Sequence, residues 1–155
     1  MSEEAVRTTP LSHPRTGGRE IALQYLYMHD VLVGKDVQAF DTYAALQPPI
    51  GKESTDFARK LVDSVIKNQA ELDAQIADVA TNWNISRMAA VDRNILRLGL
   101  AELIVHPETS YKVIINESVE LAKRFSSDEA GAFVNGLLDR LREKLRPETE
   151  AVTTA

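Results

Sequence analysis

Residues 86–106 read SRMAAVDRNILRLGLAELIVH, a stretch with the apolar spacing of a helix. Ser86 is a typical N-cap and Pro107 cannot continue a helix, so we expect one helix from Ser86 to about His106. Its apolar arc on a helical wheel carries Met88, Ile95, Leu96, Leu100 and Leu103. The opposite arc carries Arg87, Arg93, Asn94 and Arg97. The stretch therefore predicts an amphipathic helix that packs its apolar side against a core.

Helical spacing continues on both sides of this stretch, without a run of strict alternation that would predict a strand. The other helices are expected over about 18–32, 36–46, 54–66, 68–81, 111–125 and 126–145. Asn68 with Glu71, and Ser126 with Glu129, have the spacing of capping boxes at the start of two of them. We therefore expect an all-α bundle of about seven helices. Small, polar ends at residues 1–14 and 146–155 are expected to be disordered.

The composition excludes several classes of protein. The 155 residues include no cysteine, which excludes disulfides and fits a reducing cytosol. No apolar run reaches the roughly 18 residues of a membrane span, and residues 1–14 lack the apolar core of a signal peptide. We therefore expect a cytoplasmic protein without a membrane segment.

The net charge of −5 argues weakly against a general nucleic-acid binder, but the charge is unevenly placed. Residues 20–80 hold ten acidic and five basic side chains, whereas residues 81–146 hold nine acidic and ten basic ones. A polyanion would therefore be better tolerated by the second half. The alternative is a random imbalance between solvated faces.

No motif predicts enzymatic chemistry. A metal site on a helix favours two histidines three or four residues apart. The three histidines, His13, His29 and His106, lie much farther apart in the sequence. Glu117 and Glu120 share a helix face without a histidine partner, which is typical of a solvated edge. Gly17 and Gly18 lack the lysine and spacing of a phosphate loop. We expect a binding protein with no metal and no cofactor.

Two features of the helices predict binding to a macromolecule. Leu23, Tyr27 and Val31 form an apolar strip rimmed by polar side chains, which is typical of a partner-binding surface. The alternative is that this helix is central and buried nearly all round. Asp92 falls inside the apolar arc of residues 86–106, where an unpaired carboxylate is costly. It either pairs within the chain or receives a cation from another protein.

The longest motifs resemble a known family. They are REIALQYLY at 19–27, DRNILRLGLAEL at 92–103, YKVIINESVELAK at 111–123 and FVNGLLD at 133–139. In order and spacing they resemble the NusB family of bacterial transcription antitermination factors. The resemblance covers most of the chain from residue 15 to residue 145.

The resemblance implies a fold, partners and a function. The fold would be a single helical domain over residues 15–145, with subdomains roughly at 15–82 and 83–145. The partners would be the ribosomal protein NusE and single-stranded boxA-type RNA from ribosomal RNA leaders and spacers. The pair would help to load an antitermination complex on RNA polymerase.

The resemblance also implies site residues. Tyr27 and Asp92 occupy positions that face NusE, and the strip of Leu23 and Val31 would extend that interface. Phe133 matches an aromatic on the RNA side, where it would stack on an unpaired base. Phosphate contacts would come from four basic residues: Arg15, Arg19, Arg97 and Lys112.

One departure from the family weakens the RNA role. Many members have a dense arginine cluster before the first helix, but here Gly17 and Gly18 stand between Arg15 and Arg19. These glycines are expected to leave the arm flexible until RNA binds. One alternative is therefore a NusE-binding or homodimeric module with weak RNA affinity. A third alternative is a fragment of a larger ribosomal RNA methyltransferase.

Overall fold

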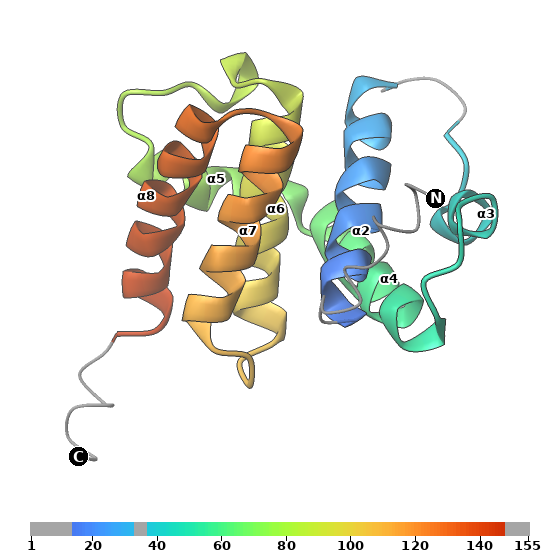
Figure 1. Cartoon of the computed structure of the whole chain (residues 1–155). Coiled ribbons are helices and arrows are strands. Elements are labelled where there is room, and N and C mark those ends of the chain that lie inside the picture. Colours follow the sequence, from blue (N-terminus) through green and yellow to red (C-terminus); the bar gives the residue numbers. More distant parts are fainter. Residues whose placement is uncertain (1–13, 33–36, 148–155) are drawn as a thin grey trace. The chain divides into compact units, whose positions relative to one another are not determined.

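The computed structural model describes residues 14–32 and 37–147 of the chain. These residues form seven α-helices and one short 3-10 helix, with no strand among them (Figure 1). The prediction of an all-α fold is confirmed. The ends expected to be disordered lie mostly outside the described residues. None of the described helices is long and apolar enough to cross a bilayer.

The backbone contacts divide the chain into two compact units, Met1–Val62 and Asp63–Ala155. The division falls inside helix α4, Lys52–Lys67, about one helix earlier than the expected boundary near residue 82. Helix α5, Gln69–Val79, belongs to the second unit because it contacts helices α6 and α8 there.

The first unit contains α2 (Pro14–Val31), α3 (Phe40–Ala45) and most of α4. Gly18 of α2 lies so close to α4 that an added Cβ would be 2.8 Å from the carbonyl oxygen of Ser54. Tyr25 of α2 packs edge-to-face on Phe40 of α3, with ring centroids 5.4 Å apart. These contacts explain why Gly18 and the aromatic residues are needed at these positions.

Helix α2 begins four residues earlier than the sequence predicts. Pro14 is its first residue, where the fixed backbone angle of proline suits a helix and its missing N–H leaves no hydrogen bond unmade. Arg15 and Arg19 are therefore helical, and the expectation of a flexible glycine arm is wrong. Helix α3 begins at Phe40, whereas residues 37–39 are not helical.

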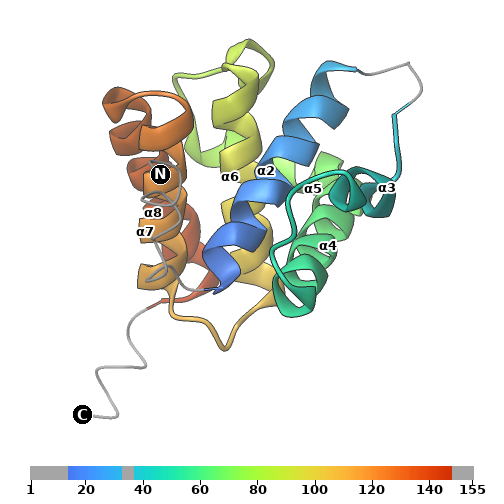
Figure 2. The ribbon, with the colours of Figure 1, turned by 45° about the vertical axis from the view of Figure 1, so that its right-hand side comes forward.

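The second unit contains α5, η2 (Ile85–Arg87), α6 (Ala90–Val105), α7 (Tyr111–Phe125) and α8 (Asp128–Leu145). Helix α6 lies beside α7 and α8 (Figure 1 and Figure 2) and also contacts α5. Every residue from Asn94 to Leu103 is buried. An added Cβ at Gly99 would lie 2.8 Å from Leu138 and 2.9 Å from the Ser118 hydroxyl. The close approach of the three long helices therefore depends on this glycine.

The helix starts differ from the predicted caps by a few residues. Asn84, not Ser86, is the cap residue before η2, and α6 begins only at Ala90. Ser127, not Ser126, caps α8 by accepting a hydrogen bond from the Ala130 N–H at 3.0 Å. The structure records no side-chain cap at Asn68, whose amide instead donates to the Ser64 carbonyl. The predicted helices exist; the caps at Ser86 and Ser126 are displaced, whereas Asn68 is the cap residue of α5 as expected but makes no capping hydrogen bond with its side chain.

Candidate functional site

A groove of about 760 Å³ opens on the second unit. Its walls come from the turn before η2, from η2 itself and from the first turns of α6 and α8. We call it the aromatic groove; its lining residues are Asn82, Trp83, Asn84, Arg87, Met88, Ala89, Asp92, Ser127, Glu129, Ala130 and Phe133. Two of the residues that the sequence singled out, Asp92 and Phe133, therefore share one site.

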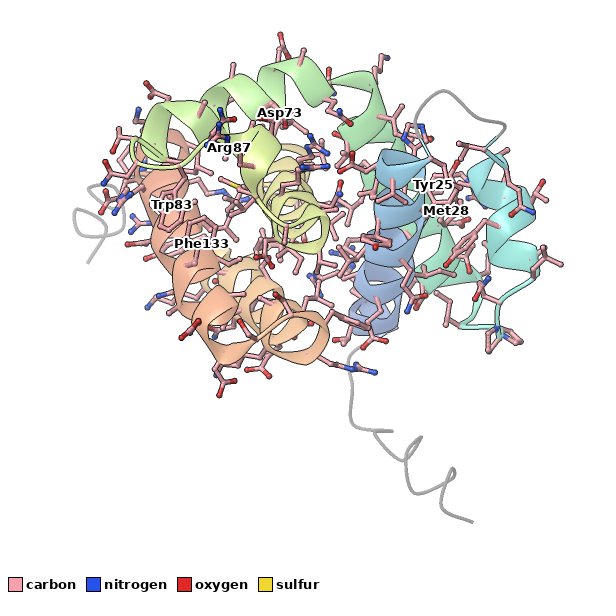
Figure 3. All side chains as sticks on the ribbon, turned by 90° about the horizontal axis from the view of Figure 1, so that it is seen from above. Tyr25, Met28, Asp73, Trp83, Arg87 and Phe133 are labelled. Atoms are coloured by element: carbon pink, nitrogen blue, oxygen red, sulfur yellow. The ribbon has the colours of Figure 1, made fainter. Side chains whose placement is uncertain are left out.

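Two aromatic rings form one wall of this groove. Trp83 and Phe133 pack edge-to-face, with centroids 5.2 Å apart and an interplanar angle of 71°, and Figure 3 shows the two rings together. Trp83 follows the end of α5 in a turn closed by its N–H and the Ala80 carbonyl, at 3.0 Å. Its side chain is 58% exposed. The sequence prediction missed Trp83, although an isolated aromatic between asparagines in a loop was a usable signal.

Asp92 places a carboxylate oxygen in the wall of the groove. Its Oδ1 atom is buried and has no hydrogen-bond partner among the described residues. Asp92 lies in the first turn of α6, where the helix dipole favours a negative charge. A buried polar atom left without a partner costs about 1–3 kcal/mol, so an incoming donor would relieve this cost.

The three arginines expected on one helix arc, Arg87 of η2 and Arg93 and Arg97 of α6, do not form an open basic face. Arg97 is 5% exposed, and its guanidinium binds both oxygens of Asp73 on α5, at 2.7 and 2.9 Å. Arg93 donates to the carbonyl oxygens of Ser86 and Met88. Arg97 is expected to contact phosphates, but in this structure its guanidinium is held by Asp73 of α5. Arg87 alone of the three is exposed and lines the aromatic groove.

The two arginines of α2 lie over the ring of Phe57 in the first unit. Their guanidinium carbons are 4.6 Å from the ring centroid for Arg15 and 5.3 Å for Arg19. Arg19 is buried, so its predicted phosphate contact does not fit this structure. Arg15 is half-buried and keeps part of its surface open. Lys112, the remaining predicted cation, is exposed in the first turn of α7.

The predicted strip on α2 is shorter than expected. Tyr27 is 42% exposed and Val31 50%, whereas Leu23 is only 2% exposed. Leu23 belongs to the core because α2 is buried on nearly all sides between Gly18 and Leu26. The alternative of a central, buried helix therefore holds for that part, and the exposed strip consists of Tyr27 and Val31.

The shifted pKa values lie away from the groove. Hydrogen bonds from Lys52 and Arg59 lower the pKa of Asp56, and the carboxylates of Asp41 and Asp56 raise the pKa of Arg59. These groups form an exposed ion-pair cluster on the first unit. Within residues 14–32 and 37–147, no group of three or more histidine and carboxylate side chains could hold a metal ion.

The chain is similar to known proteins over most of its length. The model of the NusB family matches residues 16–143. A transcription antitermination protein NusB from Anaeromyxobacter dehalogenans is 42% identical over 133 residues, which are 86% of this chain and 93% of that protein.

Solved structures agree with the sequence match. NusB of T. maritima aligns with a TM-score of 0.77 and 30% identity, covering 85% of this chain and 92% of that one. A structure of antitermination factors NusB and NusE in complex with double-stranded RNA contains a chain that aligns with a TM-score of 0.75. The two chains are 31% identical, and the alignment covers 84% of the present chain and 97% of the chain in that complex. The chain described here therefore belongs to the NusB family of transcription antitermination proteins.

Proposed function

We propose that this protein acts in transcription antitermination by binding boxA-type RNA together with NusE. The aromatic groove carries the proposal because it joins a pair of open aromatic rings to a half-buried carboxylate that has one buried oxygen without a partner among the described residues. Aromatic rings are typical of surfaces that bind unpaired bases, and a buried carboxylate is typical of a site that receives a cation. The likeness to a NusB chain solved with NusE and RNA supports the same assignment.

The RNA would contact the groove mainly through its bases. Phe133 would stack on an unpaired base, and the exposed guanidinium of Arg87 would contact a phosphate. Lys112 and the open part of Arg15 would add phosphate contacts. Three such contacts would give a salt slope of about −2 for a single strand, because each contributes about 0.7. Binding would therefore depend weakly on salt.

NusE would contact Asp92 and the exposed strip of Tyr27 and Val31. A cationic side chain or an N–H group of NusE would donate the hydrogen bond that the buried Oδ1 atom of Asp92 lacks. The complex would then join the antitermination assembly on RNA polymerase in the cytoplasm. In this role the protein binds and positions macromolecules, without catalysis and without a cofactor.

The partner assignment is tested with two variants of Asp92. Asp92→Lys should abolish NusE binding, and Asp92→Asn should weaken it at least about tenfold, because a buried interfacial charge loses its role. Calorimetric titration measures the affinity, and circular dichroism checks that the helices persist. Asp63→Asn, which neutralises an exposed carboxylate outside the groove, is the matched control. An unchanged affinity for the folded Asp92→Asn variant would remove Asp92 from the interface.

The RNA assignment is tested by fluorescence anisotropy of labelled boxA RNA across a salt series, with and without NusE. Sharper binding with NusE and rejection of a scrambled RNA would support the proposal. A duplex RNA arm shows whether the ligand is single- or double-stranded. Weak, sequence-independent RNA binding with intact NusE binding would favour the alternative of a protein-interaction module. Sedimentation at several concentrations would reveal a homodimer that uses the strip of Tyr27 and Val31.

A further inference from the structure

Trp83 stands between two hollows on the second unit. One is the aromatic groove, and the other is a hollow of about 480 Å³ whose walls come from the end of α5 and the last turns of α8. Trp83 and Asn82 line both. The predicted site residues reach only the aromatic groove, so the second hollow has no role in the function proposed above.

The indole keeps open surface for a ligand. In an edge-to-face pair one ring presents its edge to the other, so the two rings do not cover each other fully. Trp83 is more than half exposed, while Phe133 is only partly so. A tryptophan that served only to cover Phe133 would be expected to lose more of its own surface to the protein.

Cationic side chains stand on both sides of Trp83 and would meet phosphates, although carboxylates line the same hollows: Asp92 and Glu129 in the aromatic groove, Asp78 and Glu143 in the second hollow. Arg87 is exposed on the side of the aromatic groove, and no described side chain forms an ion pair with it. Arg140 and Lys144 are exposed in the second hollow, where the ammonium of Lys144 is paired with Asp78. Arg140 donates one N–H to the Val79 carbonyl, which leaves other donors of its guanidinium fork available. Asparagines flank Trp83 in the chain, so its loop is polar.

We infer that Trp83 is a second base-stacking residue and that a single RNA strand passes over it from one hollow to the other. One base would stack in the aromatic groove beside Phe133, and the next would stack on the indole. The phosphates leaving Trp83 would meet Arg140. This inference rests on the proposed RNA binding and extends the RNA path beyond the predicted residues.

The chain itself provides the probe, because Trp83 is its only tryptophan. Labelled single-stranded boxA RNA is titrated into the protein while RNA anisotropy and tryptophan emission are recorded together. A base stacked on the indole should quench the emission, with the same midpoint as the anisotropy change. A rise in anisotropy at constant emission would overturn the inference and leave the proposed function standing. Without an anisotropy change even with NusE present, the RNA function itself would fail.

The RNA affinities of Trp83 variants test the stacking role independently of the emission. Trp83→Ala should weaken RNA binding about fivefold or more, the usual range for a lost base–aromatic stack. Trp83→Phe should retain most of the affinity because it keeps a stacking face. Leu46→Ala, which truncates another exposed apolar side chain on the first unit, is the control and should change nothing. Equal affinities for the alanine and phenylalanine variants and the parent protein would refute the stacking role.

A protein ligand at Trp83 is the competing outcome. NusE added without RNA would then shift the emission of Trp83, and RNA added later would cause no further quenching. The Trp83→Phe variant has no tryptophan, so its mixture with NusE gives the emission of NusE alone, and this emission is subtracted from the titration of the parent protein. Such a result would assign Trp83 to the protein interface and overturn the inference.

Discussion

The buried pair of Arg97 and Asp73 separates two interpretations of the same arginine. If Arg97 contacted RNA, Arg97→Ala would leave the fold intact and reduce the salt slope of RNA binding by about 0.7. In the structure its guanidinium binds both oxygens of Asp73 and also donates to Asn94. The variant should therefore damage the fold of the second unit.

The expected loss follows from the geometry of the pair. Removing one partner of a fully buried ion pair costs about 3–5 kcal/mol because the other charge stays buried and unpaired. Arg97 is buried, but the side chain of Asp73 is partly exposed, and water would stabilise its carboxylate after the change. We therefore expect a loss of about 2–3 kcal/mol from a total unfolding free energy of about 5–15 kcal/mol. For a chain of this length the midpoint of thermal unfolding should fall by roughly 5–10 °C.

The assay is urea and thermal unfolding followed by circular dichroism. Asp73→Ala combined with Arg97→Ala should cost less than the two single changes added together, because the double variant leaves no unpaired charge. Arg87→Ala is the matched control, with unchanged stability and a smaller salt slope for RNA. If Arg97→Ala were as stable as the parent protein and lost RNA affinity instead, the internal role of this arginine would be refuted.

Three further predictions concern packing and surface charge. Gly99→Ala should destabilise the protein by about 1–3 kcal/mol in urea unfolding, because its Cβ would press on Leu138; an unchanged midpoint would show that the core can relax. Gly136→Ala should raise stability by about 0.5–1 kcal/mol, since its Cβ meets no atom within 4 Å on the helix α8, and a loss would contradict this account. Asp56 has a lowered pKa when folded, so its contribution is present above the unfolded value of 3.8 and is lost as pH falls through the folded pKa. Asp56→Asn should leave the thermal midpoint at pH 7 nearly unchanged because these ion pairs are exposed, and a large shift would mean that they are coupled more strongly.

Helical periodicity was enough to predict the fold class, because each helix shows one apolar side to its core. Helix α7 was predicted to the residue, and Ser110 caps it where the chain leaves the turn after Pro107. The composition of residues 1–14 predicts a disordered end, but proline fits the first turn of a helix as well as a break, and Pro14 begins α2. The start of α2, and with it the helical state of Arg15, was therefore missed.

The site was harder to predict because a helical wheel describes one helix without its neighbours. It placed Arg97 on a polar arc correctly but could not show that α5 covers that arc. It placed Leu23 on the same side as Tyr27 but could not show how far the core extends round α2. Trp83 lies in a loop, where no periodicity marks it, and only the contact with Phe133 relates it to the site.

These corrections change the expected balance of forces in RNA binding. Arg19 and Arg97 are buried, which leaves Arg15 and Lys112 of the predicted cations, together with Arg87. Few phosphate contacts and a net charge of −5 make the sequence-independent attraction weak. Base stacking and the contacts made with NusE would then have to supply most of the affinity. Because stacking releases no counterions, the affinity for boxA RNA should fall with a slope of only about −2 against the logarithm of the salt concentration, and a much steeper slope would contradict this balance.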